Sequence, residues 1–238
     1  MAYIRTRAFY LLFALWTILL VVTVPVLFLD RDGRHIRRVS RLWSRGIRVL
    51  LRWVAGIDHR IVGHENRPDG PALYVANHQS MWEALLFNLL VPDCAIVLRE
   101  NLFKIPLVGP FLKRSPMIGI RRDNMGMSTR KLIRDAKAAV AAGRSVVIFP
   151  EGTRAAPEAE TEFKSGYEIL YRYLGVSAVP VAHNAGLFWR HKSKVMQPGT
   201  VTLEFLPSIA PGMKPAEFGA LVEGQVQERR KALVSSPI

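Results

Sequence analysis

The sequence predicts an α/β fold, a mostly parallel sheet flanked by helices, preceded by an N-terminal membrane-anchoring helical segment. Three observations lead to this fold class. Short apolar runs alternate with helical patterns from residue 72 onwards, which is typical of strand–helix–strand units. The chain has 238 residues, 50% of them hydrophobic, which suffices for one α/β domain with a core of its own. An uncharged stretch of 22 residues, Ala8–Leu29, lies near the N-terminus.

Residues 1–59 are expected to anchor the protein to a membrane. As a helix, Ala8–Leu29 is long enough to cross roughly 30 Å of hydrocarbon. Residues 34–54 follow as a basic amphipathic helix, whose arginines share an arc of about 100°. These arginines are Arg34, Arg37, Arg38, Arg41, Arg45, Arg48 and Arg52. Such a helix lies in the headgroup layer of an anionic membrane; the alternative is a domain-packing helix with a solvated arginine face.

The residues flanking the apolar stretch bear on whether it is a signal peptide, a membrane-spanning helix or a segment inserted into one leaflet. A signal peptide is disfavoured, because no small-residue cleavage site follows the stretch. Pro25 allows a kink, so that insertion into one leaflet competes with a full span. Arginines are denser after the stretch than before it, which predicts a protein of the cytoplasmic membrane with its C-terminal domain on the cytoplasmic side. The single cysteine, Cys94, excludes a disulfide framework and fits that reducing compartment.

Residues 60–238 are expected to form the α/β domain, entered through the polar, turn-rich stretch Arg60–Gly70. Apolar runs predict strands at Ala72–Ala76, Cys94–Leu98, Met117–Ile120, Ser145–Phe149, Ser177–Val181 and Thr200–Leu206. Helical patterns predict helices at Met81–Leu90, Met127–Ala142, Gly166–Leu174 and Pro215–Leu233. No internal repeat or low-complexity tract interrupts this alternation.

Polar segments follow the carboxyl ends of four of these strands, at the edge where open α/β sheets bind ligands. The first segment, NHQSMWE, places His78 five residues before Glu83. On one helix these side chains would point about 140° apart. They meet only if His78 lies in the loop and Glu83 in the first helical turn. Ser80 is then the N-cap, and a capping box with Glu83 is an alternative to a catalytic pair.

The chemistry available to these residues is proton transfer and anion binding. His78 is suited to take a proton from a hydroxyl, with Glu83 fixing the imidazole tautomer. In the second segment, FPEGTR, Gly152 permits a tight turn that presents backbone N–H groups, and Arg154 offers a bidentate fork for phosphate. The alternative there is a turn stapled by a Glu151–Arg154 pair. No Ser or Cys has a nucleophile setting, so no covalent enzyme intermediate is expected.

Four ordered segments together resemble the glycerolipid acyltransferases of the 1-acylglycerol-3-phosphate acyltransferase type. NHQSMWE is similar to the His-x4-Asp block of that family, and FPEGTR matches its third block almost letter for letter. The other two are MIGIRRDN at Met117–Asn124 and AVPVAHNAG at Ala178–Gly186. NLFKIPLVGPFL, at Asn101–Leu112, resembles the stretch before the second block. The match covers roughly residues 71–186, and it departs from the family at Glu83, where Asp is usual.

The resemblance implies transfer of a fatty acyl group from acyl carrier protein or coenzyme A to the sn-2 hydroxyl of 1-acyl-sn-glycerol-3-phosphate, which yields phosphatidic acid. It implies that His78 and Glu83 are catalytic. The residues it implies for binding the phosphate and acceptor are Arg121, Arg122, Glu151, Gly152, Thr153, Arg154 and Lys164. Val179 and Pro180 are expected to line the acyl groove. An equally good interpretation is that they belong to a core strand with no role in binding. His183 is expected to be structural.

The net charge of +14 favours anionic partners. With the apolar N-terminus, it predicts contact with anionic membrane lipids and with an acidic carrier protein, and no nucleic acid. The other histidines show no metal-ligand spacing, so neither a metal nor a cofactor beyond the acyl thioester is expected. Two alternatives stay open: an acyltransferase for another acceptor, such as lyso-ornithine lipid or a lysophospholipid, and a basic membrane-tethered protein that binds anionic lipid or nucleic acid.

Overall fold

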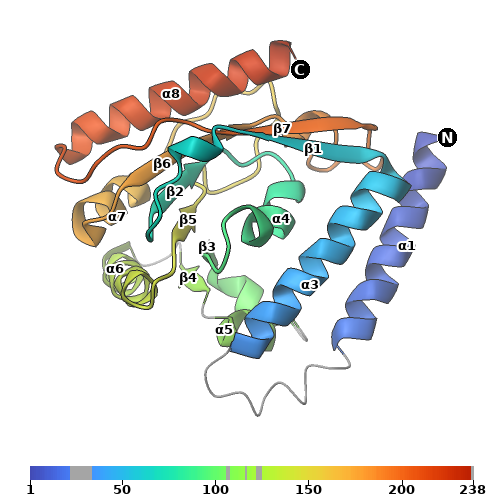
Figure 1. The fold of residues 1–238 in the computed structure, drawn as a ribbon, viewed down its shortest axis with the longest axis horizontal. Helices are drawn as coiled ribbons and strands as arrows, with labels where there is room; N and C mark the ends of the chain where they lie inside the picture. Colours follow the sequence, from blue (N-terminus) through green and yellow to red (C-terminus); the bar gives the residue numbers. More distant parts are fainter. Residues whose placement is uncertain (22–33, 106–107, 116, 122–124, 237–238) are drawn as a thin grey trace.

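The computed structural model describes residues 1–21, 34–105, 108–115, 117–121 and 125–236. A seven-stranded sheet with the order β1-β7-β6-β2-β5-β3-β4 forms its centre (Figure 1). The strands are β1 Ile57–Val62, β2 Leu73–Ala76, β3 Ala95–Arg99, β4 Ile118–Ile120, β5 Val146–Ile148, β6 Ala178–His183 and β7 Gly199–Phe205. Neighbouring strands are parallel except β6 and β7, so the predicted mostly parallel α/β sheet is confirmed.

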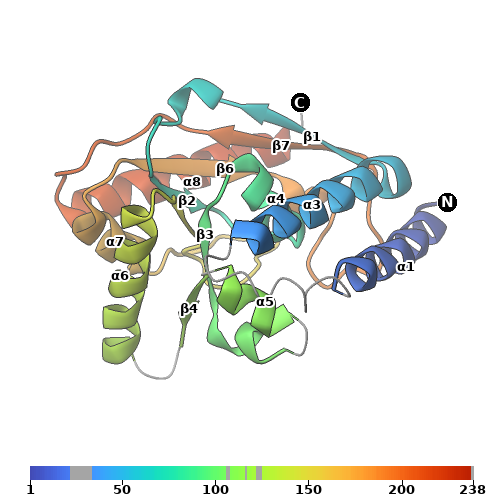
Figure 2. The same ribbon diagram turned by 60° about the horizontal axis from the view of Figure 1, so that its bottom comes forward.

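Helices cover both faces of the sheet. They are α1 Ala2–Val21, α3 Arg34–Leu50, α4 Trp82–Leu90, α5 Val108–Arg114, α6 Met125–Ala141, α7 Gly166–Leu174 and α8 Pro215–Ser235. Helices α3 and α4 lie on one face, and α6, α7 and α8 lie on the other (Figures 1 and 2). A π-helical turn, Leu51–Ala55, continues α3 and leads into β1. The chain therefore has the three-layer arrangement that its alternating pattern predicts.

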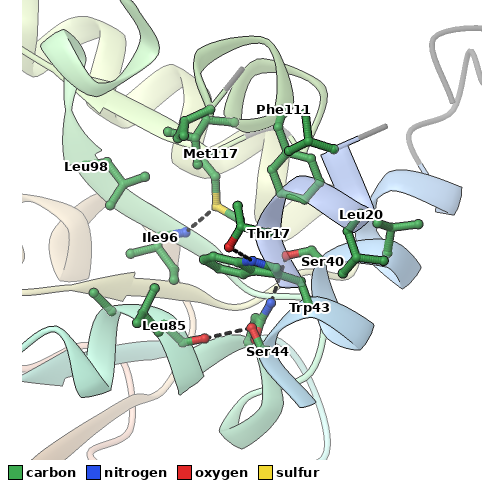
Figure 3. Close-up of a pocket in the computed structure, with 16 residues that line it drawn as sticks. Thr17, Leu20, Ser40, Trp43, Ser44, Leu85, Ile96, Leu98, Phe111 and Met117 are labelled. Carbon is green, nitrogen blue, oxygen red and sulfur yellow. Dashed lines mark hydrogen bonds between the residues drawn. The ribbon is translucent and has the colours of Figure 1, made fainter. Parts of the chain in front are cut away.

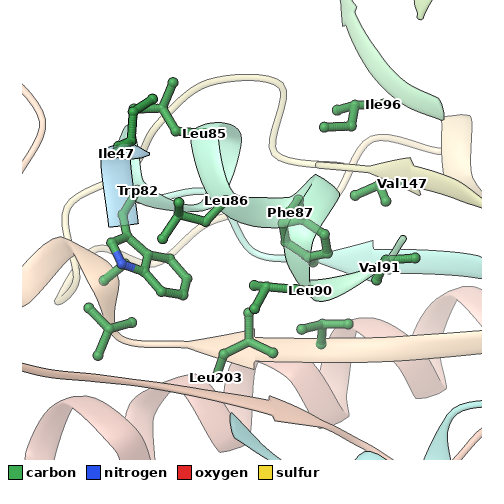
Figure 4. Close-up of a cluster of buried hydrophobic side chains, with 14 of the residues drawn as sticks. Ile47, Trp82, Leu85, Leu86, Phe87, Leu90, Val91, Ile96, Val147 and Leu203 are labelled. Carbon is green, nitrogen blue, oxygen red and sulfur yellow. The ribbon is translucent and has the colours of Figure 1, made fainter. Parts of the chain in front are cut away.

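Two hydrophobic clusters hold the layers together. Beneath α4, Trp82 and Phe87 pack with Val147 of β5 and Leu203 of β7, and Ile47 of α3 closes the cluster (Figure 4). The second cluster, on the opposite face, joins sheet residues to apolar side chains of α6, α7 and α8. Strands buried on both faces read as continuous apolar runs, which is why the sequence reveals six of the seven so clearly.

The sequence does not predict strand β1, because Arg60–Gly70 has the composition of a turn-rich entry to the domain. In the structure the first three residues of that stretch complete β1, which pairs in parallel with β7. Asp58, His59 and Arg60 hide the strand pattern, because an edge strand is only partly buried and accepts polar residues. This strand also crosses the predicted boundary between residues 1–59 and 60–238, and that division stays a prediction.

The N-terminal helices pack side by side along the edge of the domain (Figure 2). Helix α1 begins at Ala2, six residues before the predicted start, and residues 22–29 of the predicted helix lie outside the described part. The indole of Trp16 donates to the carbonyl of Trp43 at 3.0 Å, and Arg5 Nε donates to the carbonyl of Val54 at 2.8 Å. Helix α1 is long and apolar enough to cross a membrane, and only 11% of its most hydrophobic window is buried, which supports membrane association.

Candidate active site

Four parallel strands bring the predicted site residues to one edge of the sheet. His78 follows β2, Glu151 and Arg154 follow β5, and Arg121 follows β4. Strand β6, beside β2, ends at His183. Carboxyl ends of parallel strands meet at the same edge, so segments up to about 100 residues apart in the chain converge there.

His78 and Glu83 form a hydrogen-bonded pair. His78 Nδ1 lies 2.8 Å from Glu83 Oε1. The imidazole is 18% exposed, whereas the Glu83 side chain is fully buried. Burial alone raises the pKa of Glu83, but the nearby imidazoles of His183 and His78 and the Ser80 N–H outweigh it, so the net pKa lies below its usual value. An ionised carboxylate only accepts hydrogen bonds, so Nδ1 carries the proton and Nε2 is left with the basic lone pair.

Local helix chemistry explains how a spacing of five residues brings the two side chains together. Helix α4 begins at Trp82, with His78 in the loop before it. Ser80 Oγ accepts from the Trp82 N–H at 3.1 Å, and Glu83 Oε1 accepts from the N–H groups of Gln79 and Ser80 at 2.8 and 2.6 Å. Glu83 therefore accepts from the backbone ahead of the helix and holds His78 with the same oxygen. The N-cap is Met81 rather than the predicted Ser80 and makes no side-chain cap bond, so only the Glu83 half of the capping box forms.

The backbone and ring of His78 are also held from β5. The His78 N–H donates to Glu151 Oε2 at 3.0 Å, and its carbonyl accepts from the Ala155 N–H at 2.9 Å. The imidazole stacks on Phe149, with ring centroids 4.6 Å apart. These contacts fix the position of His78 independently of its partner carboxylate.

The FPEGTR segment forms a tight turn at the end of β5. Gly152 has a φ of +66°, a conformation that favours glycine. Its carbonyl accepts from Arg99 Nη2 at 2.7 Å. Glu151 is buried. It accepts hydrogen bonds from the His78 N–H at 3.0 Å and from the Thr161 hydroxyl at 3.1 Å, and these contacts take the place of the alternative Glu151–Arg154 pair. Burial raises the pKa of Glu151, and these two hydrogen bonds counter it.

Cationic side chains surround this turn. Arg154 is partly exposed and lies within electrostatic range of His191. Lys164 and Thr153 are exposed, and the Lys164 N–H donates to the Pro150 carbonyl at 3.1 Å.

Arg121, which is 64% exposed, has its Nε 3.4 Å from Glu100 Oε2. Arg122 lies outside the described residues, and its role in binding the phosphate stays a prediction. Assignment of the cationic side chains as phosphate ligands also stays a prediction.

His183 belongs to a buried clamp rather than to the exposed part of the site. Asn77 Nδ2 donates to the His183 carbonyl at 3.0 Å, and the His183 N–H donates to Asn77 Oδ1 at 2.9 Å. His183 Nε2 lies 2.7 Å from the Asn77 carbonyl. Burial lowers the pKa of His183, which favours a neutral ring donating through Nε2. The clamp joins β2 to β6 directly before His78, as expected for a structural histidine.

An apolar pocket of about 140 Å³ opens between α1, α3, α4, α5 and β3 (Figure 3). Trp43 crosses it and donates to Thr17 Oγ1 at 3.1 Å, and Phe111 and Met117 close its far side. Leu85 and Leu98 line it and are close in sequence to Glu83 and Arg99, but neither His78 nor Glu83 lines the pocket. Val179 and Pro180, the predicted acyl groove, are buried in β6 and do not line it; their role stays a prediction.

Sequence reasoning missed Arg99 and Thr161. Arg99 ends β3 and holds the FPEGTR turn, and the only available signal was its place after a buried strand. Thr161 carried no signal, because its contacts to Glu151 and to α8 span 10 and 66 residues. Among the described residues, no group of three or more His, Cys, Asp or Glu side chains is placed to hold a metal ion.

Comparison with known proteins agrees with this geometry. A family model described as acyltransferase matches residues 58–184. The 1-acyl-sn-glycerol-3-phosphate acyltransferase of Pseudomonas aeruginosa is 31% identical over 98% of this chain and 89% of that protein. The enzyme of the same name from Limnanthes douglasii is 26% identical, over 82% of this chain and 67% of the other.

The fold has a solved counterpart. The crystal structure of the 1-acyl-sn-glycerophosphate acyltransferase PlsC from Thermotoga maritima matches with a TM-score of 0.78 at 24% identity, covering 99% of each chain. At that identity the likeness establishes the fold, while the family model and the Pseudomonas relative establish the family. The chain therefore belongs to the acyltransferase family that includes the 1-acyl-sn-glycerol-3-phosphate acyltransferases, and it is an O-acyltransferase.

Proposed function

We propose that this protein transfers a fatty acyl group from acyl carrier protein or coenzyme A to the sn-2 hydroxyl of 1-acyl-sn-glycerol-3-phosphate, which yields phosphatidic acid. The observation that carries the proposal is the His78–Glu83 pair, 2.8 Å apart, at the sheet edge where the family's blocks converge. The names of the relatives from Pseudomonas and Limnanthes support the choice of acceptor.

In the proposed reaction, His78 Nε2 removes the proton of the acceptor hydroxyl as its oxygen attacks the thioester carbonyl carbon. Glu83, buried and ionised, stabilises the imidazolium that forms. The carbon–sulfur bond then breaks, and the leaving thiolate takes the proton from His78. The acyl group thus passes directly from the thioester sulfur to the acceptor oxygen, without an acyl-enzyme.

The one cysteine of the chain supports direct transfer. Cys94 is buried, and this burial raises the pKa of its thiol to about 12. A thiol with so high a pKa is a poor nucleophile at neutral pH.

Binding of the two substrates is assigned to the surroundings of the pair. Arg99, Arg154 and Lys164 supply positive charge for the acceptor phosphate, since arginine forks match phosphate oxygens. The apolar pocket between α1, α3 and α4 offers space for part of an acyl chain. Its walls include α1, the helix whose apolar residues are exposed, and we propose that the lipid enters from the membrane surface along this helix.

The same helices orient the protein. Arg38, Arg45 and Arg48 are exposed on α3, beside the exposed apolar side chains of α1. Such a surface suits an anionic leaflet. We place the catalytic domain on the cytoplasmic side of the cytoplasmic membrane, where acyl thioesters are made.

A substrate panel tests the proposal. Purified protein in detergent is given defined acyl carrier protein and coenzyme A thioesters with 1-acylglycerol-3-phosphate, lyso-ornithine lipid and lysophosphatidylethanolamine. Faster turnover of 1-acylglycerol-3-phosphate than of either other acceptor is expected. Turnover of another acceptor alone would reject the assignment of substrate, and binding of lipid without turnover of any acceptor would reject the enzyme itself.

A further inference from the structure

One face of the C-terminal helix α8 carries a polar stripe made of Glu223, Gln227 and Arg230. Their spacing of four and three residues places them on the same side of the helix. Glu223 Oε1 accepts from the backbone N–H of residue 163 at 2.8 Å. Gln227 Nε2 donates to the carbonyl of Thr161 at 2.7 Å, and Arg230 Nη2 donates to the carbonyl of Ala159 at 2.8 Å. The stripe thus holds residues 159–163, the segment that follows the FPEGTR turn.

A continuous set of hydrogen bonds leads from this stripe to His78. Gln227 Nε2 also donates to Thr161 Oγ1 at 2.8 Å, and that hydroxyl donates to Glu151 Oε1 at 3.1 Å. The other oxygen of Glu151 accepts from the His78 N–H at 3.0 Å. Successive donors and acceptors of this kind polarise one another inside a protein. The route from Gln227 to the backbone of His78 thus passes through two side chains, Thr161 and Glu151.

Arg230 adds a charge to the same region. Its side chain is among the largest that are fully buried, with 1% of the residue exposed. Nε and Nη1 of Arg230 are buried without hydrogen-bond partners among the described residues. A buried cation of this kind is costly unless it faces negative charge. Arg230 lies within electrostatic range of Glu151 and Glu160, and it favours the ionised form of Glu151 that accepts from His78.

We propose that Gln227 and Arg230 are positioning residues for acyl transfer, acting through Thr161 and Glu151 on the backbone of His78. The inference rests on the proposed function. Neither residue touches the reacting atoms; the C-terminal helix holds the base where its Nε2 meets the acceptor hydroxyl. Misplacement of a catalytic group by about 1 Å costs on the order of 10²-fold in rate, so small relaxations of this network are measurable in kcat.

Paired variants of Thr161 test the hydrogen-bond route. Thr161→Val removes the bridging hydroxyl at nearly constant shape, and Thr161→Ser keeps it. We expect Thr161→Val and Gln227→Leu each to lower kcat about tenfold, with KM for 1-acylglycerol-3-phosphate changed less than about twofold. Thr161→Ser restores most of the lost kcat. Because the two changes act on one route, the double variant loses little more than either alone.

Arg229→Gln is the matched control. Arg229 neighbours Arg230 on α8, but its Nε pairs with Glu204 at 2.6 Å, away from the FPEGTR segment. The control is expected to lower the melting temperature and to leave kcat unchanged. Loss of kcat in the control equal to that in Thr161→Val, at equal loss of melting temperature, would show that the network is merely structural and would overturn the inference.

Arg230 is tested by the pH dependence of kcat. The charged or titratable groups facing Glu151 are Arg230 from α8 and His78 from the loop after β2. Loss of the Arg230 cation raises the pKa of Glu151 further, so Glu151 is protonated at a higher pH in Arg230→Met and its hydrogen bond from the His78 N–H weakens there. The fall of kcat on the acid side of the profile, the acid limb, is therefore expected to begin at a higher pH. Arg230→Lys keeps a cation and moves the limb less, and it remains informative if the methionine variant does not fold. An acid limb in Arg230→Met that coincides with those of wild type and Arg229→Gln would overturn the role of Arg230. If the methionine variant does not fold, an unchanged kcat in Arg230→Lys, which loses the guanidinium contact to the Ala159 carbonyl, would overturn it.

The wild-type assay separates the two levels of failure. Wild type that acylates a lysolipid, beside Thr161→Val and Gln227→Leu variants with wild-type kcat, refutes the inference alone. Wild type that acylates no lysolipid from any thioester refutes the proposed function and the inference that rests on it.

Discussion

Replacing Glu83 with glutamine separates its two structural roles. Glu83 Oε1 accepts from His78 Nδ1 and from the N–H groups of Gln79 and Ser80, at 2.8, 2.8 and 2.6 Å. The amide oxygen of glutamine still accepts from the two backbone groups, so the start of α4 is retained. The negative charge beside the imidazole is lost, however, and with it the stabilisation of the imidazolium that forms during acyl transfer.

The magnitudes of the two effects differ. A hydrogen bond to a charged acceptor is worth about 1 kcal/mol more than one to a neutral acceptor, so the three bonds to Oε1 account for a loss of about 3 kcal/mol of stability. The amide NH2 of glutamine replaces Oε2, which is buried without a partner among the described residues, and adds about 1–3 kcal/mol when it finds no acceptor. The loss of stability is smaller than this sum, because neutral glutamine does not carry the desolvation cost of a buried carboxylate. Removal of the carboxylate behind a catalytic histidine lowers kcat by roughly 10²- to 10⁴-fold.

The assay compares kcat with the melting temperature of each variant in the same detergent. Glu83→Asp, which restores the residue usual in the family, retains the charge and is expected to recover part of kcat. Glu204→Gln is the control for loss of a carboxylate elsewhere, since Glu204 pairs with Arg229 on α8. If Glu83→Gln lowers stability while kcat stays at the wild-type value, Glu83 only caps α4 and the reasoning is refuted.

Three further predictions concern the surroundings of the pair. Arg154→Ala is expected to raise KM for 1-acylglycerol-3-phosphate at least about tenfold, because one charge-assisted contact to the phosphate is lost. The KM for a neutral lysolipid is expected to rise less, and equal changes of KM for both acceptors would contradict a phosphate-binding role for Arg154. Gly152→Ala forces an L side chain to a φ of +66° and is expected to cost about 1 kcal/mol in the free energy of unfolding, measured by denaturant titration, whereas no loss would show that the turn relaxes. Because burial lowers the pKa of His183 below 6.5, its contribution to stability is present above that pH and lost as the pH falls towards the lowered value. His183→Gln should flatten this part of a plot of melting temperature against pH, and a slope equal to that of the wild type would contradict the neutral buried ring.

Local patterns were sufficient to predict most of the fold. Buried parallel strands are continuous apolar runs, and six of the seven were predicted from the sequence. The edge strand β1 is not predicted, because its polar residues Asp58–Arg60 resemble a turn-rich segment. These residues form a strand only through their pairing with β7. Pairing across about 140 residues leaves no local trace in the sequence.

The candidate site divides in the same way. His78, Glu83 and the FPEGTR residues occur in short segments whose order identifies them, and the structure brings them together at one sheet edge. Arg230 was not anticipated, because an arginine on an amphipathic helix normally faces water. Its burial against the FPEGTR segment depends on the docking of α8 onto the sheet, which is a tertiary event.

The central claim is that one imidazole, held by a buried carboxylate, takes the proton of the acceptor hydroxyl. Single-turnover acyl transfer by His78→Ala, beside the wild type, measures this most directly. We predict a fall in rate of at least about 10³-fold, with the variant still folded and still bound to vesicles that contain 1-acylglycerol-3-phosphate. Transfer by the variant within about tenfold of the wild-type rate would contradict a catalytic role for His78.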